Sequence, residues 1–308
     1  MTVAQQEVLK AGEVAPQETT AERLTGQLSR IALHVILIGL TIAWIVPTLG
    51  LLVSSFRPFA QIATTGWWTA LSPPFAFTLS NYREVLESNN LGTSFLNSLM
   101  ISIPGTIIPT TFAAFAAYAF AWMRFPGRTF FFLVLVGLLA VPLQVTFIPV
   151  LSIFQRLQLN GTLPGFYAFL GIWVAHAGYG LPFAIYLLRN FFASLPSDLF
   201  ESAAIDGAGP LTVFFRIVLP LSVPALASLV IFQFLWVWND LLVALIYLGG
   251  TPDVAPMTVT VANLVNSLGQ GYHLLTAAAF LTMFLPLVVF FSLQRYFVRG
   301  ILAGSVKG

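Results

Sequence analysis

The sequence predicts an all-α, polytopic membrane protein with six transmembrane helices. Of its 308 residues, 58% are hydrophobic and only 8% are charged, whereas a soluble domain carries roughly 25% charged residues. The mean hydropathy is +0.89, and a water-soluble core of this size cannot enclose so much apolar surface. The apolar residues are gathered in stretches long enough to cross a bilayer core, which needs about 20 residues per helix.

Six stretches meet the length requirement, and we number them spans one to six. Among the 13 Lys and Arg residues and the 11 Asp and Glu residues, only Asp240 falls inside a span. The run after Arg30 is too long for a signal peptide and has no small-residue cleavage site behind it, so we expect a retained first span. The spans are residues 31–53, 95–122, 129–154, 166–188, 217–247 and 274–293.

The segments outside the spans carry all the Lys, Arg, Asp and Glu residues other than Asp240. Residues 1–30 show no apolar periodicity, so we expect a flexible tail. An outward loop over 54–94 follows the first span, a five-helix core occupies 95–294, and a C-terminal tail covers 295–308. Within the outward loop, "LSNYREVLE" predicts a short helix that begins near Ser80.

The tryptophans of the outward loop and the prolines of the spans each have both a structural and a functional interpretation. Trp67 and Trp68 in the outward loop are the type that anchors at lipid headgroups, although an exposed pair could also bind a ligand. Every span contains proline, which bends a helix and can leave room for a cavity. Proline is also commoner in membrane helices in general, so this pattern alone favours a pathway only slightly.

The positions of Lys and Arg predict the orientation. Cytoplasmic flanks of membrane spans carry an excess of these residues. With the N-terminus inside, ten of them lie on the cytoplasmic side and three outside, so we expect both termini and the loop 189–216 to be cytoplasmic. The ten are Lys10, Arg23, Arg30, Arg124, Arg128, Arg189, Arg216, Arg295, Arg299 and Lys307, and the three are Arg57, Arg83 and Arg156.

Several function classes are excluded by composition and by missing motifs. The chain has no cysteine, which excludes disulfides and thiolate metal sites. His34, His176 and His273 show no metal-ligand spacing. A net charge of +2 is too mild to indicate nucleic acid as a partner. No phosphate-binding G-x-x-x-x-G-K-[ST] pattern and no HExxH or GxSxG motif occurs, so neither an ATP site nor an intramembrane enzyme is expected.

The stretch "SDLFESAAIDGAGP" in the cytoplasmic loop predicts a short amphipathic helix. Asp198 is the expected N-cap, with Glu201 three positions on as in a capping box. Gly207 can take the left-handed conformation that ends a helix, and Gly209 with Pro210 begins the next one. A small-residue helix of this length permits close approach by another protein surface.

The spacing within this stretch resembles the EAA motif of the membrane subunits of binding-protein-dependent ABC importers. Ser202 stands where the family usually has alanine, a change between two small residues. Further stretches resemble the carbohydrate branch and its maltose-type six-span permease subunit over residues 81–308: "SNYREVL", "FLNSLMIS", "AYAFAWMRFPGR" and "RGILAGSVKG". The residues that match the motif are Glu201, Ser202, Ala203, Gly207, Ile217, Leu219 and Pro220.

This resemblance implies a type I ABC importer fold and a role as the permease subunit of an ATP-driven sugar importer in the inner membrane of a prokaryote. The implied partners are a second permease subunit in a heterodimer, a dimer of cytoplasmic ATPase subunits and an extracytoplasmic sugar-binding protein. ATP and Mg would bind to the ATPase, and this chain would hold no cofactor and no catalytic residue. Which sugar is carried stays open among maltose, trehalose, other α-glucosides and a monosaccharide.

The resemblance also assigns residues to the coupling step. The last outward loop, residues 248–273, would reach into the binding protein and displace its sugar, although a plain solvent loop would have the same composition. Ile217, Leu219 and Pro220 would hold the helix that follows the docking segment. The docking face toward the ATPase would be Glu201, Ser202, Ala203, Ala204, Asp206 and Gly207.

Five polar residues at membrane depth are candidates for a gate or pathway. Amides together with aromatic rings could contact sugar hydroxyls, but such amides more often bond neighbouring helices. An acid inside a span is a functional candidate, so Asp240 is either a gate or partner contact, or a satisfied structural acid. A secondary transporter, the rival class, would show duplicated halves and several buried ionisable groups. The candidates are Asn97, Gln144, Gln233, Asn239 and Asp240.

Overall fold

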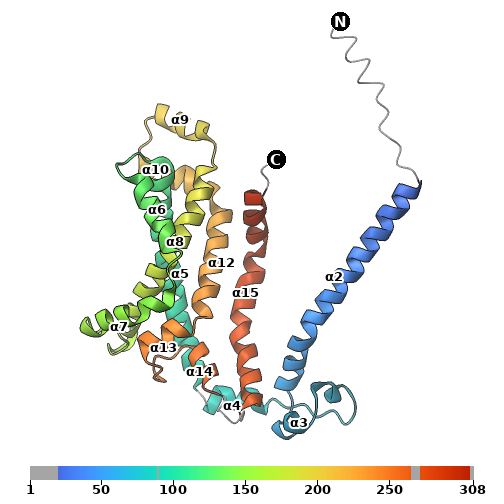
Figure 1. Ribbon diagram of the computed structural model, residues 1–308. Coiled ribbons are helices and arrows are strands. Elements are labelled where there is room, and N and C mark those ends of the chain that lie inside the picture. The colour runs from blue at the N-terminus through green and yellow to red at the C-terminus, as the bar shows by residue number, and fades with distance from the viewer. Residues whose placement is uncertain (1–19, 89, 265–270, 306–308) are drawn as a thin grey trace.

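The computed structural model describes residues 20–88, 90–264 and 271–305, and these residues form helices joined by turns and short loops (Figure 1). Four helices are long and apolar enough to cross a membrane, and two further pairs of bent helices raise the number of candidate spans to six. The predicted all-helical, polytopic architecture is therefore confirmed.

The bundle is built around helix α5, Leu91–Trp122. Helix α8, Leu170–Ala193, and helix α12, Val223–Trp238, both pack against it, and α15, Tyr272–Ser305, packs against α12. Small residues let these helices approach closely, and buried alanines of α5 and α8 share one core cluster. The helices contain or overlap the predicted spans two, four, five and six.

The terminal helices are longer than predicted. Helix α2, Thr20–Ser55, contains span one but begins at Thr20, inside the predicted flexible tail of residues 1–30. Residues 1–19 lie outside the described residues. Helix α15 continues to Ser305, so the described part of the predicted C-terminal tail extends the last helix. Once a helix has formed, each further residue adds one backbone hydrogen bond, which favours such extensions.

Span three, predicted over 129–154, is present as a candidate span but is not one continuous helix. Helix α6, Arg128–Leu138, is followed by a 3₁₀ turn, η2, Leu143–Thr146, and by α7, Phe147–Arg156. The two halves meet at an angle of 97°. Pro142 lies in the break, where it disfavours a helical conformation of the residue before it and offers no N–H to continue the helix.

Span five, predicted over 217–247, is also divided. A bend of 76° separates Pro210–Leu221 from α12. The first part contains α10, Pro210–Val213, a π-helical turn η4, Phe214–Val218, and α11, Leu219–Leu221. Pro220 and Pro224 flank the bend and remove two helical donors. A second break follows Trp238 and precedes α13, Leu242–Leu248.

The short helices lie at two opposite ends of the bundle (Figure 1). One end carries α3, Phe59–Thr64, η1, Trp67–Leu71, α4, Ser80–Ser88, and α14, Met257–Ala262. Helix α4 confirms the short helix predicted from Ser80. The other end carries α9, Ser197–Ile205, together with the Thr20 end of α2 and the last turns of α15. Both terminal helices thus end on the side of the predicted docking segment.

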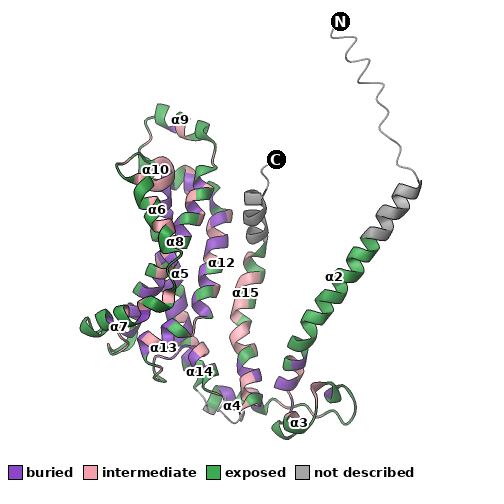
Figure 2. Cartoon of the chain, in the orientation of Figure 1, coloured by how far each residue is buried: buried purple, intermediate pink, exposed green. Residues whose placement is uncertain are grey.

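Helix α2 stands apart from the bundle (Figure 1). Its side chains are exposed along most of their described length, and burial begins only near its C-terminal end, around Gly50 (Figure 2). Apolar side chains such as Ile38 and Trp44 point away from any described neighbour of this chain. The helix therefore offers an apolar surface on nearly all sides.

Candidate functional site

Helix α9 begins differently from the prediction. Its N-cap is Pro196, and no side chain caps it. The expected capping box of Asp198 and Glu201 is therefore wrong, because a proline before the helix moves its start to Ser197. Asp198 instead lies in the first turn, where its negative charge suits the positive end of the helix dipole.

The end of α9 is as predicted. Gly207 adopts a left-handed conformation with φ of 73°. Its N–H donates to the carbonyl of Ala204 at 3.1 Å, and the N–H of Ala208 donates to the carbonyl of Ala203 at 2.9 Å. This pair of bonds is the Schellman arrangement that closes a helix. Gly209 and Pro210 then begin α10.

Aromatic residues fix α9 to the end of α5. The Phe200 ring stacks on the Trp122 ring with centroids 3.5 Å apart. The indole N–H of Trp122 donates to the carbonyl of Phe192 at 2.8 Å, and the hydroxyl of Tyr118 donates to the carbonyl of Pro210 at 3.2 Å. The sequence reasoning missed these contacts, although Trp122 and Tyr118 belong to the quoted "AYAFAWMRFPGR" stretch.

The predicted docking residues lie mostly on the surface. Ala203 is buried against the bundle, whereas the other five members of the predicted docking face are exposed. Ile205, which was not among them, is 87% exposed and presents a large apolar side chain beside them. Ile217 and Leu219 are half-buried and pack against the core cluster, and Pro220 is exposed.

The five polar candidates at membrane depth do not form one group. Asn97 is buried and donates its amide hydrogens to the carbonyls of Asp253 and Ala255, at 3.0 and 3.1 Å. It therefore ties α5 to the segment between α13 and α14. Gln144 is exposed in η2, and Asn239 is exposed and bonds only to the carbonyl of Leu235 on its own helix, at 2.8 Å.

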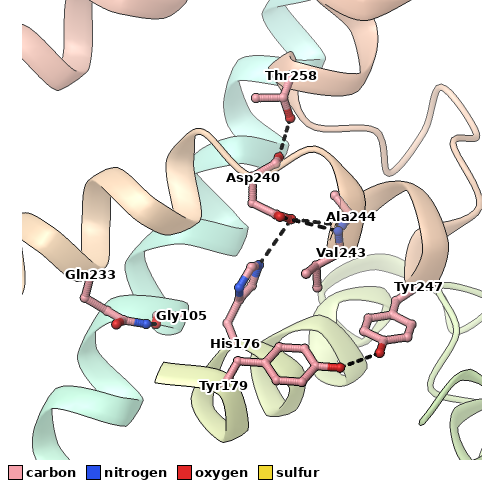
Figure 3. Close-up of polar contacts among 9 residues, drawn as sticks. All are labelled: Gly105, His176, Tyr179, Gln233, Asp240, Val243, Ala244, Tyr247 and Thr258. Carbon is pink, nitrogen blue, oxygen red and sulfur yellow. Dashed lines mark hydrogen bonds and ion pairs between the residues drawn. The ribbon is translucent and has the colours of Figure 1, made fainter. Parts of the chain in front are cut away.

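Asp240 lies in the break between α12 and α13 (Figure 3). Its carboxylate accepts the backbone N–H of Val243 at 3.4 Å and that of Ala244 at 3.1 Å, so it caps α13. Its backbone carbonyl accepts the hydroxyl of Thr258 at 2.7 Å. Of the two interpretations left open by the sequence, this geometry favours the satisfied structural acid.

His176 is a neighbour of Asp240 that the sequence reasoning did not select. The ring is fully buried on α8, and its Nε2 lies 3.9 Å from a carboxylate oxygen of Asp240 (Figure 3). It packs edge-on against the Trp236 ring, with centroids 5.3 Å apart. Tyr179 lies nearby on α8. Its hydroxyl shares a hydrogen bond of 2.6 Å with the hydroxyl of Tyr247 on α13 and so joins the two helices.

Gln233 lies between three helices and bonds to one of them. It is 4% exposed on α12, and its Nε2 donates to the carbonyl of Gly105 on α5 at 3.3 Å (Figure 3). On α8 it faces Gly180, where an added Cβ would lie 2.6 Å from Nε2. The side chain also lines a hollow of about 310 Å³ with Tyr179, Gly180, Phe183, Phe232 and Trp236.

The described residues contain no cluster of three His, Asp or Glu residues that could hold a metal ion.

A family model described as "binding-protein-dependent transport system inner membrane component" matches residues 110–303. The chain belongs to this family. It is thus a transmembrane permease subunit of a binding-protein-dependent ABC importer, a multi-pass protein of the inner membrane and not the ATPase.

Relatives of this permease are similar over most of its length. The "osmoprotective compounds uptake permease protein GgtD" of Synechocystis sp. is 54% identical over 301 residues, which cover 97% of this chain and 99% of the relative. The "alpha-glucoside transport system permease protein AglG" of Rhizobium meliloti is 55% identical over 244 residues, which cover 79% of this chain and 63% of the relative. These relatives agree with the carbohydrate branch indicated by the sequence.

A solved structure shares the fold. It is the crystal structure of a bacterial ABC transporter involved in the import of the acidic polysaccharide alginate. The TM-score is 0.70 at 21% sequence identity, and the match covers 92% of this permease and 100% of the other chain. The predicted ABC importer fold is confirmed at the level of architecture.

Proposed function

We propose that this permease forms half of the translocation pathway of an ATP-driven glycoside importer and couples to a cytoplasmic ATPase through α9. The observation that carries the proposal is the geometry of α9. It closes in a Schellman arrangement at Gly207, most of its residues are exposed, and the Phe200 ring is stacked on Trp122. A displacement of α9 would therefore be transmitted to α5 through packed rings rather than absorbed by a flexible loop.

The docking surface has the properties of an interface. It combines a carboxylate at Glu201 with the exposed apolar side chain of Ile205 and small residues between them. Ile205 is 87% exposed, so a partner that covers this face would bury a large apolar side chain next to the carboxylate. We place a dimer of ATPase subunits, with its ATP and Mg, on this face, so that one ATPase would receive α9 and the other would receive the second permease.

Helix α2 supports a second permease subunit as a partner. Interfaces between helices in a membrane depend on close packing, and α2 packs on its own bundle only near its outward end. We propose that the rest of α2 lies against the other subunit of a heterodimer. The extracytoplasmic binding protein would dock at the opposite end, which carries α4 and α14; residues 265–270 of the predicted outward loop lie outside the described residues.

The names of the relatives narrow the cargo. One is named for an alpha-glucoside and the other for osmoprotective compounds. We therefore propose a small glycoside as the transported solute, delivered by a sugar-binding protein. The excess of Lys and Arg at the α9 end supports a cytoplasmic position for that end and for both termini.

The coupling role can be tested with the assembled complex in proteoliposomes, together with its binding protein and trehalose or maltose. Glu201→Ala should lower sugar-stimulated ATP hydrolysis by roughly tenfold or more, because a charged contact at an interface is lost. The amount of permease inserted in the membrane should not change. Unchanged stimulation would contradict the docking role of α9.

A matched control removes a carboxylate from the opposite end of the molecule. Glu87 is an exposed acid of α4, paired with Arg83 at 3.7 Å, and Glu87→Gln should leave stimulation unchanged.

Because the chain has no cysteine, a single Ser202→Cys variant can be cross-linked specifically. It should form a product with the ATPase subunit; labelling from the outside of intact cells would place α9 on the wrong face.

A further inference from the structure

We propose that the hollow between α8 and α12 is a contact site for one neutral sugar ring on its way through this permease. This inference deepens the proposed function and rests on it. We call the six lining residues the aromatic hollow: Tyr179, Gly180 and Phe183 of α8, and Phe232, Gln233 and Trp236 of α12.

The walls of the hollow are aromatic. Phe183, Phe232 and Trp236 are between 38% and 44% exposed, and Tyr179 is half-buried. They come from two helices and converge on one space of about 310 Å³. Aromatic rings offer large apolar faces with well-defined positions, and the C–H faces of a pyranose ring are the apolar part of a sugar. The walls therefore fit the faces of a sugar ring.

The floor of the hollow carries a polar group with unused capacity. The Nε2 of Gln233 donates to Gly105, but no described residue donates a hydrogen bond to its Oε1. An amide oxygen accepts up to two hydrogen bonds. The α8 backbone passes so close to this amide at Gly180 that only a residue without a side chain fits there, and Gln233 still forms part of the lining of the hollow. Oε1 can therefore accept a hydroxyl from a ligand in the hollow.

The same amide distinguishes a ligand site from a surface in contact with lipid. Hydrocarbon cannot donate a hydrogen bond, and an unsatisfied polar group in the bilayer core is strongly unfavourable. A glutamine that is 4% exposed and lines an open hollow would carry that penalty if lipid filled the space. Water and sugar hydroxyls both satisfy it, so the hollow suits a hydrated pathway.

The chemistry of the walls also limits which sugars fit. No Lys, Arg, Asp or Glu residue lines the hollow. A uronate or a phosphorylated sugar would bring a charge into the hollow, where no opposite charge is present. Burying an unpaired charge is far less favourable in free energy than burying an uncharged hydroxyl. The volume is at the lower end of the range for ligand pockets, about 300–1,000 Å³, so it accommodates one ring at a time.

The test compares uptake of radiolabelled trehalose and maltose by the reconstituted complex with its binding protein. Trp236→Ala removes the largest wall and should lower uptake of at least one sugar by roughly tenfold. Trp236→Phe keeps an aromatic face and should restore most of that uptake. The matched control is Phe112→Ala, which removes an exposed aromatic ring of α5 outside the hollow and should leave uptake unchanged.

Selectivity separates a ligand contact from a merely structural role. We expect Trp236→Ala to change the ratio of trehalose to maltose uptake, since the two disaccharides present their rings differently. An equal fall for both sugars, or uptake equal to that of Phe112→Ala, would overturn the contact site. If the unmodified complex imports no sugar with ATP, the proposed function itself fails, and that result is distinct because it is seen without any substitution.

Discussion

Glu201 on α9 and Asp240 next to α13 lie toward opposite ends of the bundle (Figure 1), and the two acids differ in burial and in hydrogen bonding. Glu201 is exposed on α9, and no described residue bonds to its side chain. Asp240 has a side chain that is 12% exposed, and its oxygens are used by two backbone N–H groups of α13. The sequence placed both acids among the functional candidates.

The difference lies in where the hydrogen-bond capacity of each acid is used. The carboxylate oxygens of Asp240 accept hydrogen bonds from the first turn of α13, so this acid stabilises the fold. Glu201 keeps its acceptors for another molecule. Substitutions beside α13 should therefore lower the stability of the whole subunit. Substitutions at the α9 end should have local effects on stability and should act on coupling to the ATPase.

The largest effect on stability is expected for Asp240→Leu. This change removes the cap of α13 and leaves its first N–H groups unpaired, which should lower the free energy of unfolding by about 2–3 kcal/mol. Asp240→Asn retains one acceptor oxygen and should cost about half as much. Thermal unfolding of the purified complex measures both; equal midpoints for Leu, Asn and the unmodified chain would show that the cap does not matter.

A smaller effect is expected for Asn97→Ala. Its amide bonds two carbonyls of the last outward loop, and leaving them unpaired should lower the free energy of unfolding by about 1–2 kcal/mol. Asn239→Ala is the matched control, because that amide is exposed and bonds only to its own helix. Its cost should stay within about 0.5 kcal/mol. If Asn239→Ala lowered the free energy of unfolding more than Asn97→Ala in the same assay, the structural role assigned to Asn97 would be wrong.

The smallest effect is expected at the α9 end. Gly207 has φ of 73°, so Gly207→Ala should strain α9 by about 1 kcal/mol. Amides of residues 203–208 should then exchange hydrogen roughly fivefold faster, while the rest of the bundle is unaffected. Gly209→Ala, at φ of −71° with no atom near its Cβ, should change nothing. Faster exchange across the whole bundle would contradict the separation of the two ends.

The sequence predicted continuous helices better than breaks. Pro104 and Pro109 lie inside α5, which stays unbroken for 32 residues, whereas Pro142 coincides with a turn of 97°. Helix α5 is held on two sides by α8 and α12, while α6 has no buried residue. Proline permits a break without requiring one, since α2 also continues through Pro47 although most of its length is exposed.

The candidate site was predicted in part. Local spacing located α9 and its glycine end, because a helix stop depends on a few adjacent residues. It did not reveal that Phe200 stacks on Trp122, or that His176 faces Asp240, because these pairs are far apart in the chain. Gln233 was named as a pathway candidate, but its aromatic surroundings come from two helices and could be recognised only together.

The sequence by itself determined the membrane setting, the helical class and the family, since apolar length, charge placement and motif spacing are properties of contiguous chain. Only the tertiary structure decided which polar groups are satisfied from within and which remain available. The physical reason is that a hydrogen bond is either made or left open by partners distant in sequence, and in a membrane an open one demands a ligand, water or another subunit.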